Sequence, residues 1–138
     1  MKIQQISIFL ENAAGRMAEV TRVLKAGDVN LRAIMIADTA DFGILRIIVD
    51  DPSKALKILT EAKFTTRTTD VLAVTISDEV GSLSNVLTLF EKNAINIEYL
   101  YAALDKAGET AVIIFKVENI EKGLKVVEAN GLGTSMKF

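Results

Sequence analysis

The sequence contains an internal repeat, which appears when the chain is slid against itself by 66 residues, the interval between Gly15 and Gly81. In this register Asn30 also meets Asn96, and apolar residues match around both pairs. After residue 103 the second copy gains two residues, so the offset becomes 68. A unit of this size buries only about 60% of its unfolded surface and is marginally stable alone. We therefore expect two small units, residues 1–69 and 70–138, in a fixed relation.

Each copy predicts the order strand, helix, strand, strand, helix, strand. Strands are indicated by apolar residues that alternate along the chain, and helices by apolar residues three and four positions apart. Gly27 and Asn93 stand where the first helix of each copy should end, while Asp51, Pro52 and Asn119 are typical of helix starts. The expected elements of the first copy are strands at 3–10, 29–37, 42–49 and 64–69 and helices at 15–26 and 52–63. Those of the second are strands beginning near 71 and at 95–104, 110–117 and 133–138, a helix through Leu83, Val86, Leu87 and Phe90 that is capped at Asn93, and a helix at 120–129.

The connections and strand faces complete the predicted fold. Hairpins are expected around residues 38–41 and 105–108, and residues 65–74 read as nearly continuous extended chain. This order predicts an α+β protein with two tandem ferredoxin-like βαββαβ units, each a four-stranded antiparallel sheet with two helices on one face. Residues 44–49 and 111–115 are apolar on both alternating faces, so we expect the helix-free face to be covered by the sister unit or by another chain.

Composition excludes several classes of function. The net charge is −2 and Lys and Arg form no dense run, which argues against a nucleic-acid partner. No apolar stretch approaches the roughly 18 residues of a membrane-spanning helix, and the first residues lack the apolar core of a signal peptide. We therefore expect a cytoplasmic protein without a membrane partner.

The chain has no histidine and no cysteine. This excludes Ser-His-Asp and Cys-His nucleophiles, an imidazole general base, disulfides, and metal sites built from thiolate or imidazole. The remaining Asp, Glu, Lys, Ser and Tyr residues form no convincing catalytic cluster. We expect a protein that is not an enzyme and that carries no metal or cofactor.

Two equivalent sets of residues, one in each copy, are candidates for ligand binding. In each, a polar residue and a glycine form the turn between the first strand and the first helix, and an asparagine opens the next strand. Free amides at a helix N-terminus attract a carboxylate, glycine lets a ligand approach the backbone, and asparagine offers both a donor and an acceptor. This set suits a small zwitterion. The residues are Asn12, Gly15 and Asn30 in the first copy and Asp78, Gly81 and Asn96 in the second.

Each of these residues also has a purely structural interpretation. The two glycines can be present for their backbone angles alone. Asn12 and Asp78 can be helix N-caps, and the two strand-entry asparagines can satisfy the local backbone. Recurrence of the whole set at one offset favours a binding site, although a duplication also preserves structural needs.

The strand, the polar-x-x-Gly-x-(Leu/Met) turn, the amphipathic helix and the Val/Ile-Asn-Ile/Leu strand entry resemble the ACT domain over essentially the whole chain. Tandem stand-alone ACT proteins are the most similar, and residues 97–99 are similar to regulatory subunits of acetolactate synthase. Many members place Pro before the glycine, where this chain has Ala14 and Val80, and Asp78 in place of Asn12 makes the two copies unequal. The resemblance implies ligand contacts at Asn12, Ala14, Gly15, Arg16, Met17, Asn30, Leu31, Asp78, Val80, Gly81, Ser82, Leu83, Asn96 and Ile97.

The same resemblance implies a function. It predicts a non-catalytic regulatory protein that binds a free amino acid at the interface of paired ACT units and modulates a metabolic enzyme. A homodimer is the expected assembly. The alternative is an ACT-type oligomerisation or interaction module with no functional ligand site.

Overall fold

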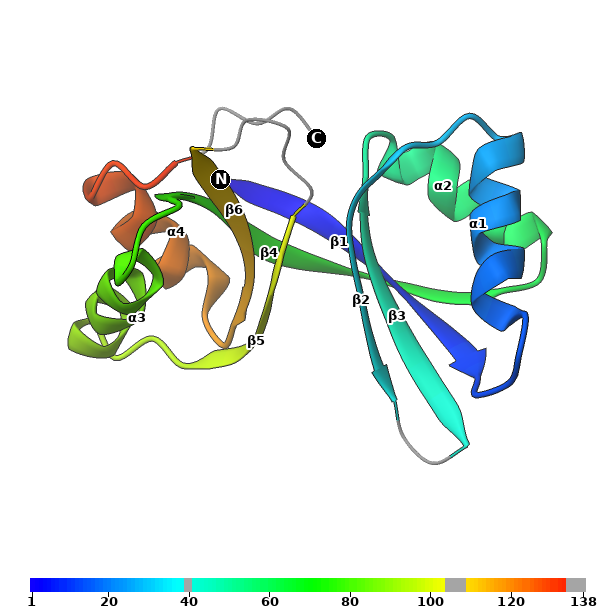
Figure 1. Ribbon diagram of the computed structural model, residues 1–138, viewed down its shortest axis with the longest axis horizontal. Helices are drawn as coiled ribbons and strands as arrows, with labels where there is room; N and C mark the ends of the chain where they lie inside the picture. The colour runs from blue at the N-terminus through cyan, green and yellow to red at the C-terminus, as the bar shows by residue number, and fades with distance from the viewer. Residues whose placement is uncertain (39–40, 104–108, 134–138) are drawn as a thin grey trace. The chain divides into compact units, whose positions relative to one another are not determined.

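The computed structural model describes residues 1–38, 41–103 and 109–133, and the chain divides into two compact units. The first is Gln4–Thr69, which we call the N-terminal unit. The second, the C-terminal unit, consists of Met1–Ile3 together with the described residues from Asp70 onward. Both are α+β, and Figure 1 shows two helices packed on one side of the strands in each unit.

The elements of the N-terminal unit follow the predicted order. Asp51 caps α2 by accepting a hydrogen bond from the Lys54 amide, and Pro52 occupies its first turn. Gly27 is the C-cap of α1, as predicted. The elements are β1 (Lys2–Glu11), α1 (Arg16–Ala26), β2 (Leu31–Asp38), β3 (Phe42–Val49), α2 (Pro52–Glu61) and the beginning of β4 (Thr65–Ser77).

The C-terminal unit repeats this order. Asn119 caps α4 by accepting from the Lys122 amide, and Asn93 is the C-cap of α3. The predicted tip of its hairpin at 105–108 and nearly all of the predicted strand at 133–138 lie outside the described residues, as do residues 39–40 of the first hairpin. The elements are the remainder of β4, α3 (Ser82–Lys92), β5 (Ile97–Ala102), β6 (Thr110–Val117) and α4 (Ile120–Ala129).

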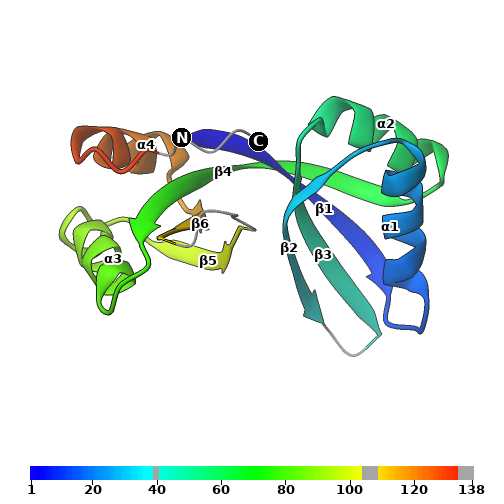
Figure 2. The ribbon, with the colours of Figure 1, turned by 45° about the horizontal axis from the view of Figure 1, so that its top comes forward.

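In the N-terminal unit the sheet order is β2-β3-β1-β4. Strand β3 is antiparallel to both of its neighbours, with Leu45 opposite Ile8 on one side and opposite Ile36 on the other. The helices cover one face of this sheet (Figure 2). The core between the two layers is aliphatic, because the strand residues that face the helices alternate with those that do not. Its fully buried members include Ile6, Ile8, Leu24, Leu45, Ile47 and Leu59.

In the C-terminal unit, β6 lies between β4 and β5 and is antiparallel to both. Residues Met1–Ile3 belong to this unit: the Ala73 amide donates to the Met1 carbonyl at 2.8 Å, and the Met1 amino group donates to the Ala73 carbonyl at 3.1 Å. Lys2 forms an ion pair with Glu121 at 3.0 Å. That hydrogen-bonded carboxylate raises the pKa of Lys2 above its ordinary value. The first residues of the chain thus help to complete the sheet of the C-terminal unit, although the N-terminal unit separates them from it in the sequence.

The buried residues of the C-terminal core include two aromatic side chains, whereas those of the N-terminal core are all aliphatic and the partly buried Phe64 packs against them. The rings of Phe90 and Phe115 lie 5.2 Å apart between centroids, edge to face. Both side chains are essentially inaccessible to solvent, among aliphatic neighbours such as Leu72 and Val74.

The prediction of nearly continuous extended chain at residues 65–74 is confirmed, because β4 is a single strand of 13 residues. The predicted strands that are apolar on both faces are largely buried. On the helix-free face, Ala33 and Ile48 are buried in the N-terminal unit, and Ala73 and Ile114 are buried in the C-terminal unit.

Candidate functional site

The turns that precede α1 and α3 have the same backbone conformation. Gly15 has φ 86° and Gly81 has φ 89°, and each is the N-cap of its helix. This left-handed region is strained for residues with a side chain. A Cβ at either glycine would meet no other atom within 4 Å. The space beside both glycines is therefore open, and the requirement for glycine comes from φ rather than from packing.

The interpretation of Asn12 and Asp78 as helix N-caps is wrong. The N-cap positions belong to the glycines, and neither helix has a side-chain cap hydrogen bond. The Asn12 amide instead donates to the Asp41 carbonyl at 2.9 Å, and the Asp78 amide donates to the Glu109 carbonyl at 3.0 Å. Both residues are exposed at the ends of the strands that lead into the turns.

The absence of a side-chain cap leaves amides of the first turn available. In α1 the first hydrogen bond of the helical ladder runs from the Glu19 amide to the Gly15 carbonyl, at 3.0 Å. The amides of Met17 and Ala18 precede it and point out of the helix end. In α3 the corresponding first bond runs from Asn85 to Gly81. Both helix ends thus present backbone donors and a partial positive charge beside an uncrowded glycine.

The side chains around the N-terminal turn are held by neighbours. The Arg16 guanidinium pairs with Glu19 at 2.7 Å and lies 5.7 Å from the centroid of the Phe64 ring. Met17, in the first turn of α1, is exposed. The N-terminal turn therefore combines uncharged residues with one cation whose guanidinium is already held by Glu19.

The C-terminal turn has different chemistry. The hydroxyls of Ser77 and Ser82 are hydrogen-bonded at 2.8 Å, and Ser77 also donates weakly to Glu79 at 3.4 Å. Asp78 and Glu79 add two exposed carboxylates, and Val80 is fully exposed. Sequence reasoning missed Ser77, although its position just before the turn and the serine five residues later were available as a signal. This turn favours cations and hydrogen-bond donors.

The strand-entry asparagines lie away from the glycine turns of their own units. Asn30 follows the C-terminus of α1, whereas Gly15 precedes its N-terminus, and a helix of 11 residues is about 16 Å long. Asn96 stands in the same relation to Gly81 across α3. No single unit brings its glycine turn and its asparagine together.

The backbone of each asparagine is engaged locally. The Asn30 amide donates to the Asp50 carboxylate at 3.0 Å, its carbonyl accepts from the Asp50 amide at 3.1 Å, and the Asn96 carbonyl accepts from the Glu118 amide. These bonds use main-chain atoms, so the structural interpretation holds for the backbone. Both residues are exposed, and the side-chain amides remain accessible to a ligand.

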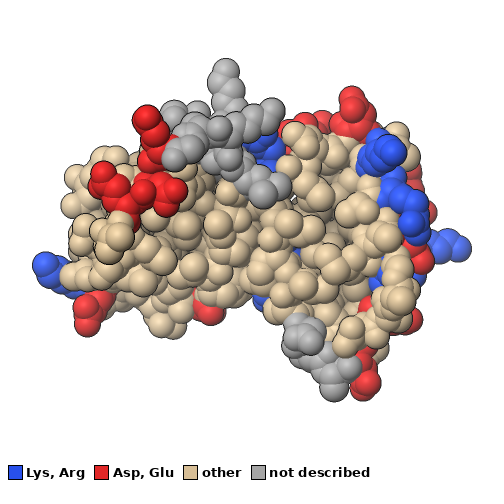
Figure 3. All heavy atoms as spheres, viewed as in Figure 1, with Lys and Arg blue, Asp and Glu red and all other residues tan. Residues whose placement is uncertain are grey.

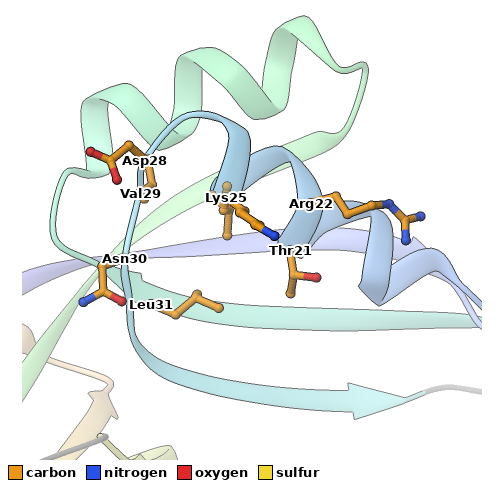
Figure 4. A pocket seen from close by; sticks show the side chains of 8 residues that line it. Thr21, Arg22, Lys25, Asp28, Val29, Asn30 and Leu31 are labelled. Atoms are coloured by element: carbon orange, nitrogen blue, oxygen red, sulfur yellow. The ribbon is translucent and has the colours of Figure 1, made fainter.

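Asn30 and Leu31 line an open pocket of about 690 Å³ between α1 and the start of β2. Thr21 and Lys25 belong to its helical wall, and Figure 4 shows Arg22 and Asp28 extending away to opposite sides. A second pocket of about 480 Å³ in the C-terminal unit includes Asn96, Asn119 and Lys122. Sequence reasoning did not single out the basic residues of α1.

Charge differs between the helices of the two units. On the face shown in Figure 3, basic side chains follow the helices of the N-terminal unit and a group of acidic side chains lies on the C-terminal unit. In the sequence, residues 16–32 contain four basic and two acidic side chains, whereas the equivalent residues 82–98 contain one basic and two acidic.

Two further properties bear on function. Among the described residues, no cluster of three or more Asp or Glu side chains has the arrangement needed to hold a metal ion. None of the described helices is both long enough and apolar enough to cross a membrane.

The family model of the ACT domain pair matches residues 1–135. Protein BT0572 from Bacteroides thetaiotaomicron is 38% identical, with a TM-score of 0.90 over 96% of this chain and 91% of that chain. The ligand-free regulatory subunit of aspartate kinase from Thermus thermophilus has the same fold at 18% identity, with a TM-score of 0.63 over 91% of both chains. E. coli aspartokinase III in complex with lysine and aspartate is similar at 13% identity, with a TM-score of 0.54. That match covers 96% of this chain and 32% of the aspartokinase chain. A search of curated proteins found no match.

Proposed function

Because the chain belongs to the ACT domain pair family, we propose that it is a non-catalytic regulatory protein that binds a free amino acid where ACT units pair. The observation that carries this proposal is the contrast between the helix starts. Helices α2 and α4 have side-chain caps, but α1 and α3 begin at left-handed glycines with open space and free first-turn amides. A side-chain cap stabilises a helix by about 1 kcal/mol. The chain forgoes this stabilisation at both α1 and α3, which is consistent with backbone amides that are reserved for hydrogen bonds to a ligand.

The amino acid's α-carboxylate would accept hydrogen bonds from the amides of Met17 and Ala18 beside Gly15. This arrangement satisfies the amides that the helix leaves open and places the negative charge at the positive end of the helix dipole. The side-chain oxygen of Asn12 suits the ammonium group. Since Asn30 of the same unit lies at the far end of α1, the strand-entry asparagine that completes the site must come from another ACT unit, which we assign to a second copy of the chain.

The two turns are unequal as binding sites. The N-terminal turn is uncharged apart from Arg16, whose guanidinium is paired with Glu19. Asp78 and Glu79 place two carboxylates at the C-terminal turn, where they attract an ammonium but repel a carboxylate. We therefore propose the turn at Gly15 as the stronger site.

Regulation would pass to a separate enzyme. The fold match to a regulatory subunit of aspartate kinase spans 91% of both chains, so a protein of this size and fold serves there as a separate regulatory chain. We propose that the present protein likewise modulates a metabolic enzyme and works as a homodimer in the cytoplasm.

A second candidate is an interaction module without a ligand. It is favoured by the apolar residues exposed along β2, Ile34 and Ile36, because exposed edge strands recruit other strands. Ligand binding separates the two candidates.

A thermal-shift screen of the twenty amino acids tests the proposal. An amino acid present at 100 times its Kd adds about 2.7 kcal/mol to the free energy of unfolding, and we expect a rise in Tm for one or a few related amino acids. If none of the twenty shifts Tm at millimolar concentration, the amino-acid proposal is wrong and the interaction module is favoured.

Calorimetry on variants then locates the site. Gly15→Val should abolish binding, because it imposes strain at φ 86° and fills the space beside the amides. Removing the completing asparagine, by Asn30→Ala or Asn96→Ala, should cost about 1–3 kcal/mol of affinity. Gly133→Val is the matched control, since its added atoms also meet open space but its φ is not left-handed. Equal affinity in Gly15→Val, with folding verified by circular dichroism, would show that the ligand binds elsewhere.

A further inference from the structure

The open pocket beside Asn30 in the N-terminal unit combines apolar and charged residues. Its apolar part consists of Leu24 and Val29, which are buried, and Leu31, which is half-buried. The Val29 amide donates to the Leu24 carbonyl at 3.0 Å, so the connection after α1 folds back against the helix and fixes this part of the wall. Sites for small molecules are typically concave, largely apolar and of about this size, 690 Å³. The pocket can therefore bury the hydrocarbon part of a small molecule.

The helical side of the same pocket is basic. Arg22 and Lys25 both line it, and both residues are exposed. They lie three positions apart on one face of α1, where like charges repel each other and cost the helix some stability. Neither forms an ion pair or a side-chain hydrogen bond with any residue that the structure describes. Both charges are therefore available to an anion, unlike the charge of Arg16, which is paired with Glu19.

Negative groups near the pocket do not neutralise this pair of cations. Asp28 also lines the pocket, but Figure 4 shows its side chain and that of Arg22 extending to opposite sides. Carbonyls at the end of α1 are occupied by the chain itself, because the Gly27 and Asp28 amides donate to those of Val23 and Lys25, each at 3.1 Å. The helical side of the pocket thus keeps its positive charge.

The C-terminal unit retains the apolar character of this lining but not its cations. At the three apolar positions the second copy is again apolar, whereas Thr88 and Glu91 stand in the places of Arg22 and Lys25. The core requires the apolar residues in both units, but it does not require the two cations. Lys25 also suits the negative end of the helix dipole, a role that Lys92 can fill in α3. Arg22, one turn earlier, has no such structural role, and a ligand of the N-terminal unit accounts for both residues.

We propose that this pocket is a second ligand site, which binds a small organic anion made of a carboxylate or phosphate group and a short hydrocarbon body. The anionic group accepts charge-assisted hydrogen bonds from Arg22 and Lys25, and the hydrocarbon body lies against the apolar lining. Gly15 begins the same helix at its other end, and a helix of 11 residues is about 16 Å long. A small molecule in this pocket does not reach the glycine turn of its own unit, so the site does not rest on the proposed amino-acid site.

A nuclear magnetic resonance titration of the backbone amides, without added amino acid, tests the site with four probes. Isovalerate and isopentyl phosphate each join an anionic group to the same branched body, and the tighter of the two identifies the preferred group. Isovaleramide keeps the body without the charge, and inorganic phosphate keeps a charge without the body. We expect the two organic anions to shift amides within residues 21–31, with affinities that fall as salt is raised. Isovaleramide and inorganic phosphate should each bind roughly tenfold more weakly, or less.

Two pairs of substitutions then connect binding to the cations. Arg22→Gln/Lys25→Gln removes both charges but keeps long polar side chains, and it should weaken the binding of isovalerate roughly tenfold or more. Lys54→Gln/Lys57→Gln is the matched control, because it removes two exposed charges at the same spacing on α2. The control should bind isovalerate as the wild type does.

The site is wrong if neither organic anion shifts the amides of residues 21–31 at millimolar concentration. An isovaleramide affinity equal to that of isovalerate, or unchanged binding in Arg22→Gln/Lys25→Gln, shows that the cations do not recognise the ligand and overturns the proposal. Inorganic phosphate that binds as tightly as isopentyl phosphate overturns the assignment to an organic anion. Because no amino acid is present, each of these outcomes leaves the proposed amino-acid binding to be judged by calorimetry.

Discussion

The N-terminal and C-terminal units differ most at their surfaces. On the helix-free face of the N-terminal sheet, Phe9 and Phe42 are 42% and 58% exposed. At the equivalent positions the C-terminal unit has Thr75 and Thr110. The same contrast holds in the turns, where Asp78 replaces Asn12. Side chains that contact solvent have diverged in polarity and in charge between the two copies.

Positions that control the backbone have not diverged in this way. Gly15 and Gly81 share a left-handed conformation to within a few degrees, and the second helix of each unit begins at a capping Asp or Asn. Helices α1 and α3 begin and end at positions related by the same interval of 66 residues. The comparison teaches that a position with a special backbone conformation accepts few residue types in either unit. Exposed positions accept many, so each unit can present different side chains to a partner or ligand.

The two cores have diverged in side-chain type but not in burial. The aromatic pair Phe90 and Phe115 corresponds to Leu24 and Ile47 in the N-terminal unit. Both solutions are fully buried. Two different side-chain sets therefore fill the same space between two helices and a sheet.

The largest expected effect comes from the cores. Phe90→Ala should lower the free energy of unfolding by about 3–5 kcal/mol, and Leu24→Ala by about 2–5 kcal/mol, because each leaves a cavity. The aromatic variant should cost more, since it also loses the edge-to-face contact with Phe115. Urea denaturation measures both, with Leu100→Ala as an exposed control. An equal loss for the two variants would mean that the aromatic pair adds nothing beyond its buried area.

The glycine turns should respond alike in both units. Gly15→Val and Gly81→Val each force a β-branched residue into the left-handed region, at a cost of about 1–2 kcal/mol or more. Thermal unfolding of the two variants, compared with Gly133→Val, measures that cost. A clearly smaller loss at one glycine would show that its turn can relax, and the equivalence of the two turns would fail.

The smallest effects are expected at the caps. Asp51→Ala and Asn119→Ala each remove one side-chain acceptor from a helix amide and should each cost about 1 kcal/mol. Ser53→Ala, an exposed change in the first turn of α2, is the control. Chemical denaturation in which one cap variant matches its control would indicate that this helix start is held by tertiary packing instead.

Much of the fold was predictable because its signals are local. The interval between Gly15 and Gly81 revealed the repeat, and capping residues such as Asp51 marked the helix starts. The same local reasoning failed for Asn12 and Asp78, which looked like N-caps but are displaced from that role by glycines three residues later. Ser77 was overlooked because a serine near a turn has many ordinary uses.

By itself, the sequence determined the order of the elements, the glycine in each of the two strand–helix turns and the absence of imidazole and thiol chemistry, since each depends on residue type and short-range spacing. Tertiary structure decided the relations between distant segments. It assigned Met1–Ile3 to the unit that begins near Asp70, and it showed that the backbone of Asn30 is engaged by Asp50 while its side chain remains exposed. The physical reason is that backbone preferences act over a few residues, whereas strand partners, burial and edge charge depend on which segments the sheet brings together.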